Sequence, residues 1–225
     1  MMEGQMEPGR SRPLPPQLEA QKDHSGISPL EAKHNSISEA KSHNYNSGEH
    51  LQSQETFDHI MIESHEFTIQ SLEELPGYVK RRYPDASYIG QMTQGKRNGK
   101  GVMKYKNGRQ YEGDWELDIR QGRGFERYPN GNTYYGMFLN GKAHGKGVYT
   151  WNNGEVYDGE WDNGLKHGYG IWKGLFGDSY IGEWRHSKAE GYGVHNWKNG
   201  DRYEGEWKQC LKHGQGTDLF SNGDV

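Results

Sequence analysis

Three features of this sequence could carry chemistry: closely spaced glycines beside lysines, a recurring histidine, and one cysteine. The stretch "GKRNGKG" at 95–101 has glycines spaced somewhat as in a phosphate-binding loop. However, the Walker spacing G-x-x-x-x-G-K-[ST] is absent and no helical pattern follows. The same glycine spacing recurs along the chain, so a structural role is favoured and we expect no nucleotide or other cofactor site.

The recurring histidines stand immediately before a Gly-x-Gly pair, at His144, His167 and His213. A metal site needs several ligands that converge on one point. Side chains that form hydrogen bonds replace histidine at the same position elsewhere, namely Asn98, Gln121 and Glu190. We therefore expect a repeated hydrogen-bonding role at a turn and no metal ion.

Cys210 is the only cysteine, which excludes an intramolecular disulfide framework. It lacks the histidine and acid arrangement that nucleophilic catalysis requires, so we expect an inert thiol, no catalytic residues and a non-enzymatic chain. There is no apolar signal-peptide core at the N-terminus and no run of 18 apolar residues. These features predict a soluble protein in the reducing cytoplasm.

The elements that position these residues repeat every 23 residues. Each unit begins with a pattern close to Y-x-G-x-W, whose period of two puts the three side chains on one face of a strand. A Gly-x-Gly-x-x-x-aromatic stretch follows as a second strand, so each unit is predicted to be a β-hairpin. The six units are 88–110, 111–133, 134–156, 157–179, 180–202 and 203–225.

The links between units usually contain Asn-Gly, and one reads "YPNG". Pro129 would fall in a strand beside a two-residue turn, where its missing N–H matters. We therefore predict a three-residue loop, a type I turn followed by glycine in the left-handed region. This register sets Gly124 across from Gly136, and the paired glycines leave a trough in which aromatic rings lie flat. Trp172 is expected opposite Tyr180.

Carboxylates that alternate with the rings should point to the opposite, solvated face; they are Glu112, Asp158, Glu160, Glu204 and Glu206. The repeat is imperfect at several positions. The glycine in the middle of the hairpin is replaced by Asp118, Ser187 and Cys210, and Met92 stands where tryptophan is usual. Altered turns or packing are therefore expected in units one, two, five and six.

The composition divides the chain into three regions. Residues 1–56 contain one aromatic residue and too little apolar surface to offset the entropy of ordering, so we expect disorder. Residues 57–87 are predicted to be a short, partly ordered cap or linker on the first unit. Residues 88–225 predict an all-β fold, an elongated single-layer antiparallel sheet of tandem β-hairpins.

The stretches "YDGEWDNGLKHGYG" (157–170) and "YEGEWKQCLKHGQG" (203–216) resemble the MORN (membrane occupation and recognition nexus) repeat. The pattern of that family is approximately Y-x-G-x-W-x-x-G-x-x-x-G-x-G-x-x-x-Y-x-x-G. The resemblance implies an elongated, curved sheet with a binding groove and a scaffolding role. Proteins that look like this occur at membrane junctions, in cilia and cell-division structures, and as modules of lipid kinases.

The aromatic face is a candidate partner surface. Its rings are either used up in internal packing or leave an apolar groove for a peptide or helix. The candidate groove residues are Tyr111, Trp115, Tyr134, Phe138, Tyr157, Trp161, Trp172, Tyr180, Trp184, Tyr203 and Trp207.

A second candidate surface is the basic stretch 80–109, which contains one acid, Asp85. It is either a solvated face or a site of weak contact with an anionic membrane. Specific nucleic-acid recognition is not expected, because the rest of the array is close to neutral. The basic residues are Lys80, Arg81, Arg82, Lys96, Arg97, Lys100, Lys104, Lys106 and Arg109.

The favoured function is a non-enzymatic scaffold that binds protein partners at the cytoskeleton, cilium or membrane periphery. One alternative is the N-terminal regulatory module of a larger enzyme such as a phosphatidylinositol phosphate kinase. Another is peripheral binding of anionic lipid through the basic first repeat. Because unit six ends at Val225 without the change of character typical of a terminal repeat, we also expect a further strand at the C-terminal edge, from more repeats or by self-association.

Overall fold

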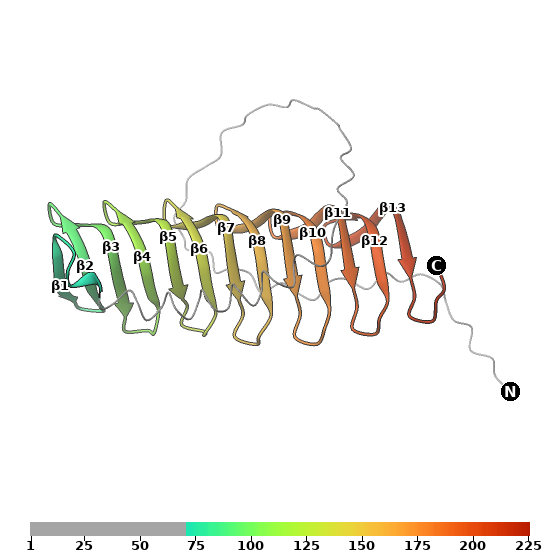
Figure 1. Ribbon diagram of the computed structural model, residues 1–225, viewed down its shortest axis with the longest axis horizontal. Helices are drawn as coiled ribbons and strands as arrows, with labels where there is room; N and C mark the ends of the chain where they lie inside the picture. The colour runs from blue at the N-terminus through green and yellow to red at the C-terminus, as the bar shows by residue number, and fades with distance from the viewer. Residues whose placement is uncertain (1–70) are drawn as a thin grey trace, which may run out of the picture. The chain divides into compact units, whose positions relative to one another are not determined.

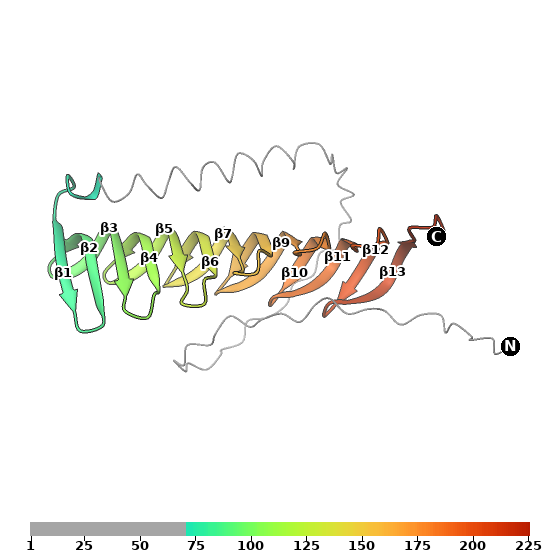
Figure 2. The same cartoon turned by 90° about the horizontal axis from the view of Figure 1, so that it is seen from below.

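The computed structural model describes residues 71–225, so the region 1–56 and the first part of 57–87 lie outside the described residues. The described part is all-β: 13 antiparallel strands form one sheet in which each strand pairs with its neighbours in sequence (Figures 1 and 2). The strands are β1 (Tyr78–Tyr83), β2 (Ala86–Thr93), β3 (Lys96–Tyr105), β4 (Gln110–Glu116), β5 (Ile119–Arg127), β6 (Thr133–Leu139), β7 (Lys142–Thr150), β8 (Val156–Asp162), β9 (Leu165–Lys173), β10 (Ser179–Arg185), β11 (Lys188–Asn196), β12 (Arg202–Lys208) and β13 (Leu211–Leu219).

Each 23-residue unit is a hairpin, as the sequence predicted, and β1 adds one strand before the first unit. β1 pairs along its whole length with β2, from Tyr78 opposite Gln91 to Tyr83 opposite Ala86. The side chain of Leu72, which precedes β1, is buried. The edge of β2 that faces away from the array is therefore covered by residues 78–83 rather than left exposed.

The turn within each hairpin has two residues, both with positive φ, as in a type I′ turn. Asn140 and Gly141 have φ of 51° and 78°. Asp118 takes the glycine position with φ of 75°, so the altered turn that we expected there is not found. Its carboxylate compensates by accepting a 3.0 Å hydrogen bond from the backbone N–H of Arg97 in the preceding hairpin. Ser187 and Cys210 accept equivalent bonds from Lys166 and Ala189.

The link between units is the three-residue loop that we predicted from the position of Pro129. The backbone N–H of Gly131 donates to the carbonyl of Tyr128 at 3.0 Å, and that of Tyr128 donates to Asn132 at 2.9 Å. Gly131 has φ of 88°, in the left-handed region. The register is also confirmed, since Gly124 lies opposite Gly136.

The tyrosine rings lie over these glycine pairs. A Cβ on Gly170 would lie 2.4 Å from the Oη of Tyr157, so only glycine leaves room for the ring. The expectation that tryptophan also lies flat is wrong. The rings of Tyr157 and Trp161 are inclined at 87°, and the indole Nε1–H of Trp161 reaches the carbonyl of Gly147 at 2.8 Å. An upright indole is needed to make that bond to the preceding hairpin.

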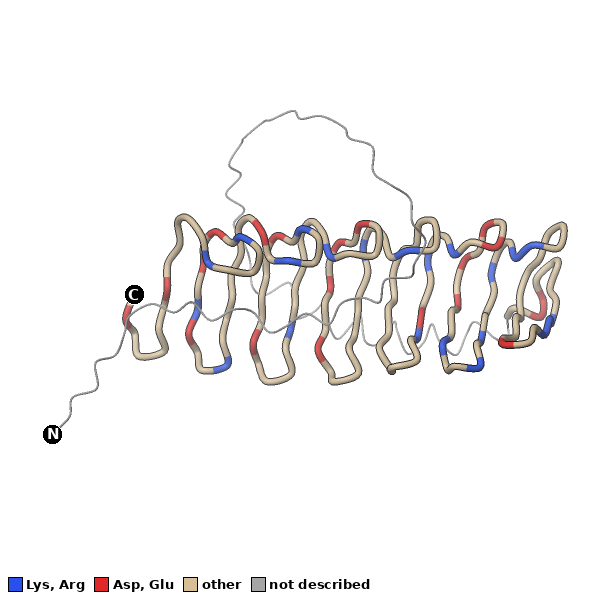
Figure 3. The backbone as a smooth tube through the Cα atoms, turned by 180° about the vertical axis from the view of Figure 1, so that it is seen from behind, with Lys and Arg blue, Asp and Glu red and all other residues tan. Residues whose placement is uncertain are grey.

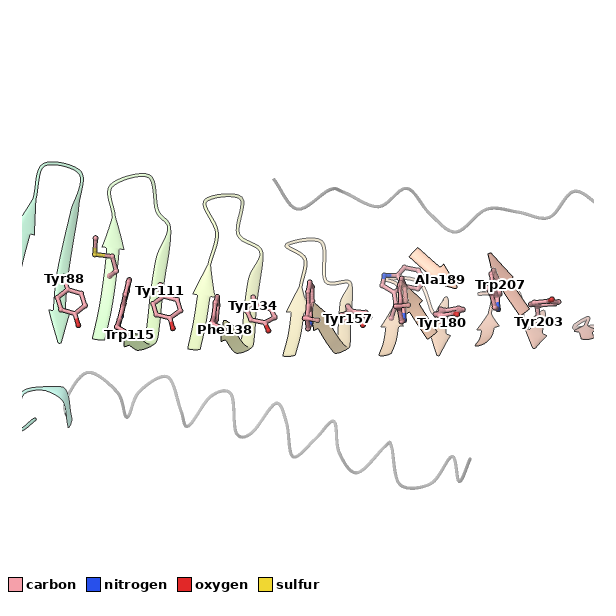
Figure 4. Close-up of a cluster of buried hydrophobic side chains, with 14 residues drawn as sticks. Tyr88, Tyr111, Trp115, Tyr134, Phe138, Tyr157, Tyr180, Ala189, Tyr203 and Trp207 are labelled. Atoms are coloured by element: carbon pink, nitrogen blue, oxygen red, sulfur yellow. The ribbon is translucent and has the colours of Figure 1, made fainter. Parts of the chain in front are cut away.

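The upright and flat rings alternate along the array and form its core (Figure 4). Tyr111 meets Trp115 of its own strand and Phe138 of the next hairpin, with ring centroids 5.0 and 5.1 Å apart and edge-to-face geometry. This geometry is favourable for aromatic pairs. Because each of the first five tyrosines contacts a ring of the next unit, the rings form a continuous aromatic ladder.

Candidate partner-binding surfaces

The eleven candidate groove residues come together as this buried aromatic ladder rather than as an exposed strip. The side chains of Tyr111, Tyr134, Tyr157 and Tyr180 have no exposed surface, and the other seven are also buried. Trp172 lies directly opposite Tyr180, as predicted. The rings on this face are therefore engaged in internal packing, and other side chains border them.

Four cations border the ladder at the start of the second strand of a hairpin, a feature that sequence reasoning missed. Their charged groups lie over the rings at distances typical of cation–π contacts. The guanidinium of Arg97 is 4.3 Å from the Trp115 ring, and the Lys166 ammonium is 4.1 Å from that of Trp184. Arg120 and Lys212 are placed in the same way.

Lys166 is the most enclosed of these cations, with 6% of its surface exposed. Its ammonium lies within 5.5 Å of the ring centroids of Trp151, Tyr157 and Trp184. Burial lowers the pKa of Lys166 to about 8. The rings favour the charged form and so oppose this shift.

Glu126 stands where units one, three and four have an apolar or aromatic residue on the ladder face, and it is 1% exposed. Its carboxylate oxygens accept hydrogen bonds from Arg109 Nε at 2.6 Å and from Arg120 at 2.5 Å. A buried carboxylate requires such partners. This ionic cluster replaces a hydrophobic contact without interrupting the ladder.

His195 occupies the same repeat position three hairpins further along, opposite Tyr180. It is 1% exposed, and its ring centroid is 4.3 Å from that of Trp197 and 6.3 Å from that of Trp172. Neither ring nitrogen has a hydrogen-bond partner within residues 71–225. Burial therefore lowers the pKa of His195 to about 4, against a weaker opposing effect of Asp178.

The opposite face of the sheet carries one side chain per strand at its middle, in a line that we call the central row. Its members are cross-strand partners from β2 to β13, for example Phe125 with Tyr135 and Val148 with Asp158. Most are apolar, and a carboxylate recurs in every second hairpin. The central row comprises Ile89, Val102, Glu112, Phe125, Tyr135, Val148, Asp158, Ile171, Ile181, Val194, Glu204 and Thr217.

The carboxylates of this face are not all solvated as expected. Asp158, Glu160 and Glu206 are exposed and Glu204 is half-buried, but Glu112 is 6% exposed. Glu112 lies between Val102 and Phe125 in the central row. The signal for the row was present in the sequence, since an apolar residue follows the second glycine of Gly-x-Gly in five units.

We predicted that the residues before Gly-x-Gly form hydrogen bonds at a turn. Three of the six form such a bond with the turn of the next hairpin. The side chain of Gln121 accepts from the backbone N–H of Asn140 at 2.9 Å, and Asn98 and Glu190 make equivalent bonds to Leu117 and Gln209. His144 instead contacts Asp162. Among the described residues, no cluster of His, Cys, Asp and Glu could hold a metal ion.

The comparison with known families matches this repeating geometry. The MORN repeat profile matches residues 88–108, 111–133, 134–156, 157–174, 180–202 and 203–225. The chain belongs to the MORN repeat family. No curated protein matches it. Among solved structures, it is similar to the TCP domain of Drosophila melanogaster SAS-4 (dCPAP), determined in complex with a proline-rich motif of Ana2 (dSTIL). The sequence identity is 15%, over 67% of this chain and 88% of that one, with a TM-score of 0.37.

The basic residues of the first MORN repeats are divided between the two faces. Arg81 lies opposite Tyr88 on the ladder face, whereas Lys100 and Lys104 alternate with Gly101 and point to the other face. Five of the nine contact carboxylates: Lys80 with Glu73, Arg97 with Asp118, Lys100 with Asp114, Lys106 with Asp85, and Arg109 with Glu126. Basic and acidic positions are accordingly interspersed along the strands (Figure 3).

The last MORN repeat ends in β13, which pairs with β12 and with no other strand among residues 71–225. Tyr203 meets the ring of Trp207 at 5.2 Å but lacks the second ring that a following repeat supplies to each earlier tyrosine. Within these residues, β13 is therefore an edge strand of the sheet.

Cys210 of the last MORN repeat is half-buried, and burial raises the pKa of its thiol. A raised pKa reduces the thiolate fraction and hence the reactivity. Among the residues that the structure describes, no helix is long and apolar enough to span a membrane.

Proposed function

We propose that this MORN-repeat chain is a non-enzymatic scaffold that binds protein partners along the central row. The observation that carries this proposal is the register: the row crosses twelve consecutive strands without a shift in position. A partner lying across the strands would meet an equivalent set of side chains at every hairpin. The partner could therefore be an extended or helical segment, which needs no deep pocket.

The two faces support a division of roles. The aromatic ladder stabilises the array from one face, and its rings are buried. The central row contributes no ring to the ladder, so a partner bound on this face would leave the ladder intact. Apolar contacts with the isoleucine and valine side chains of the row would supply affinity.

We further propose that the chain acts in the cytoplasm, at the cytoskeleton, cilium or membrane periphery. This location follows from the scaffolding role and awaits proximity labelling in cells. Enrichment of proteins from the interior of organelles would contradict it.

Site-specific photo-crosslinking of the full chain in cells tests the partner surface. A photoreactive amino acid at Ile181, in the central row, should yield discrete crosslinked proteins. The same group at Lys188, an exposed residue beside the turn of the same hairpin, should yield fewer. Equal crosslinking from both positions, or none from Ile181, would refute the proposed surface.

A further inference from the structure

The position at which the four cations border the ladder is occupied by alanine in the third and fifth MORN repeats. These alanines are Ala143 and Ala189, and each pairs across its hairpin with a ring of the ladder, Phe138 or Trp184. Alanine lacks the Cγ, Cδ, Cε and Nζ atoms with which Lys166 reaches the rings. The two repeats therefore have space beside the ladder where other repeats have a cation.

The space beside Ala189 is closed by the next hairpin. The Cys210 Sγ accepts a hydrogen bond from the backbone N–H of Ala189 at 3.3 Å, and Cys210 packs against the core. Ala189 itself has no exposed surface. The fifth repeat therefore leaves no room there for a further group.

The space beside Ala143 is open. Its carbonyl accepts a hydrogen bond from the backbone N–H of Gly164 at 2.8 Å, as the carbonyl of Ala189 does from Cys210. Gly164 thus stands where Cys210 stands two hairpins later, but it has no side chain to close the space. A Cβ on Gly164 would meet no described atom within 4 Å, and Ala143 is partly exposed. A ligand can therefore approach the ladder beside Ala143.

The three rings around the Lys166 ammonium have counterparts around Ala143, each 23 residues earlier in the sequence. Tyr134 and Trp161 have ring centroids 5.3 Å apart and planes inclined at 81°, and their counterparts beside Lys166 have 5.2 Å and 81°. The site that holds an ammonium group in the fourth repeat is therefore present in the third repeat with alanine in place of lysine. The corresponding pairs are Trp151 with Tyr128, Tyr157 with Tyr134, and Trp184 with Trp161.

Tyr149 adds a fourth ring to this site. Its ring centroid is 5.9 Å from that of Tyr128 and 6.0 Å from that of Trp161. Its hydroxyl accepts a hydrogen bond from the side-chain amide of Asn132 at 2.7 Å, which fixes the orientation of the ring. Tyr128 and Tyr149 are partly exposed, so a ligand can contact them. We call the four rings of Tyr128, Tyr134, Tyr149 and Trp161 the aromatic cage.

The aromatic cage favours one class of ligand. The negative faces of aromatic rings attract cations, and sites built from several rings bind methylated ammonium groups. An unmodified lysine ammonium is strongly hydrated, so methyl groups lower the cost of transferring it from water to the rings. Lys166 shows that the unbranched stem of a lysine side chain fits beside such rings.

We propose that the aromatic cage binds a methylated lysine side chain of a protein partner. The ammonium of that lysine occupies the place that the Lys166 ammonium has in the next repeat. The cage is on the ladder face, so it is a second partner site, on the opposite side of the sheet from the central row. It therefore goes beyond the proposed function and does not depend on it.

A capped pentapeptide with one trimethyllysine between glycines tests the cage in the full-length chain. The methyl proton resonance of the peptide should move upfield on binding, because the rings shield protons that lie over their faces. The control peptide carries the neutral carbon isostere, in which a tert-butyl group replaces the trimethylammonium group. The charged peptide should bind about tenfold more tightly in NMR titrations. Equal affinities, or no binding of either peptide, would overturn the proposal.

Filling the cage from within gives a matched pair of variants. Ala143→Lys supplies an ammonium as Lys166 does and should weaken binding of the charged peptide about tenfold. His144→Lys introduces the same side chain on the opposite face of the sheet and should leave binding unchanged. Tyr128→Leu removes one partly exposed ring and should weaken binding about threefold, whether or not Ala143→Lys folds. Equal effects of the two lysine variants, or unchanged binding by Tyr128→Leu, would contradict the cage.

Phosphatidylcholine vesicles distinguish a lipid headgroup from a protein side chain, since both carry a trimethylammonium group. The full chain should not co-sediment with these vesicles. Co-sedimentation that Ala143→Lys abolishes would overturn the assignment to a protein partner. Crosslinking from Ile181 should be the same in the wild type and in Ala143→Lys, because the central row is on the other face. Loss of peptide binding with persistent Ile181 crosslinks would reject the cage alone, and peptide binding without such crosslinks would reject the proposed function alone.

Discussion

The phenol of Tyr157 lies directly over Gly170 of the neighbouring strand. This contact explains why all six units have glycine at the position of Gly170. Five further tyrosines make the same contact with a glycine of the neighbouring strand, from Tyr88 over Gly101 to Tyr203 over Gly216. The phenolic hydroxyl of Tyr157 then donates to the carbonyl of Glu160 at 3.0 Å. Ring, glycine pair and backbone are thereby held in one arrangement that each hairpin repeats.

Replacement of Gly170 by alanine should be among the most destabilising small substitutions in the chain. The added Cβ would lie 2.4 Å from Tyr157 Oη and 2.6 Å from its Cζ, so the buried ring must move. We expect a loss of about 3 kcal/mol in the free energy of unfolding, measured by urea titration. Gly164→Ala is the control, because nothing lies within 4 Å and only its positive φ of 86° opposes alanine, at about 1 kcal/mol. Equal losses would contradict the ring contact.

Removal of the charge on Glu126 should destabilise the fold, because the two arginines that it binds would lose their counter-charge. Glu126→Gln leaves Arg109 and Arg120 near the ladder without their counter-charge. A buried ion cluster that loses one member is destabilised by about 3 kcal/mol. Glu116→Gln, on an exposed side chain at the end of β4, should change stability little. Comparable thermal unfolding of the two variants would show that the cluster is not required.

Acidification should destabilise the fold through His195. Its pKa is about 4 in the folded state and 6.5 in the unfolded state, so the unfolded chain binds the proton more readily. The contribution of neutral His195 to the free energy of unfolding is fully present above pH 6.5. It is lost as the pH falls towards 4, by up to about 3 kcal/mol. Unfolding titrations of the wild type and His195→Phe measure this directly. The difference between them should change across this pH range, and a constant difference would rule out His195 as the source.

Lys166 should show the corresponding effect at alkaline pH. Its pKa is about 8 when folded and 10.5 when unfolded, so stability rises as the pH increases from 8 to 10.5. Below pH 8 the buried ammonium carries a penalty. Lys166→Met should therefore stabilise the protein at pH 7 by about 1–2 kcal/mol. Lys142→Met, on an exposed residue, is the control. A loss of stability in Lys166→Met would mean that the surrounding rings outweigh the cost of burial.

Local patterns predicted the strands and their register because the constraints act over a few residues. The period of two in Y-x-G-x-W, the fixed φ of Pro129 and the left-handed glycine that follows suffice to define the hairpin and the loop. The same reasoning failed at Asp118. A glycine replacement there suggested an altered turn, but a hydrogen bond to Arg97 in the preceding hairpin compensates for the positive φ.

By itself, the sequence determined that this chain is an array of six MORN hairpins whose glycines accommodate aromatic rings. Only the tertiary structure decided how those rings are oriented, because the upright indole of Trp161 depends on a carbonyl of the preceding hairpin. It also decided that the basic residues divide between two faces and that Glu112 is buried while Asp158 is exposed. These outcomes depend on contacts between neighbouring units, and such contacts form only when the units pack together. The pattern within one repeat does not define them.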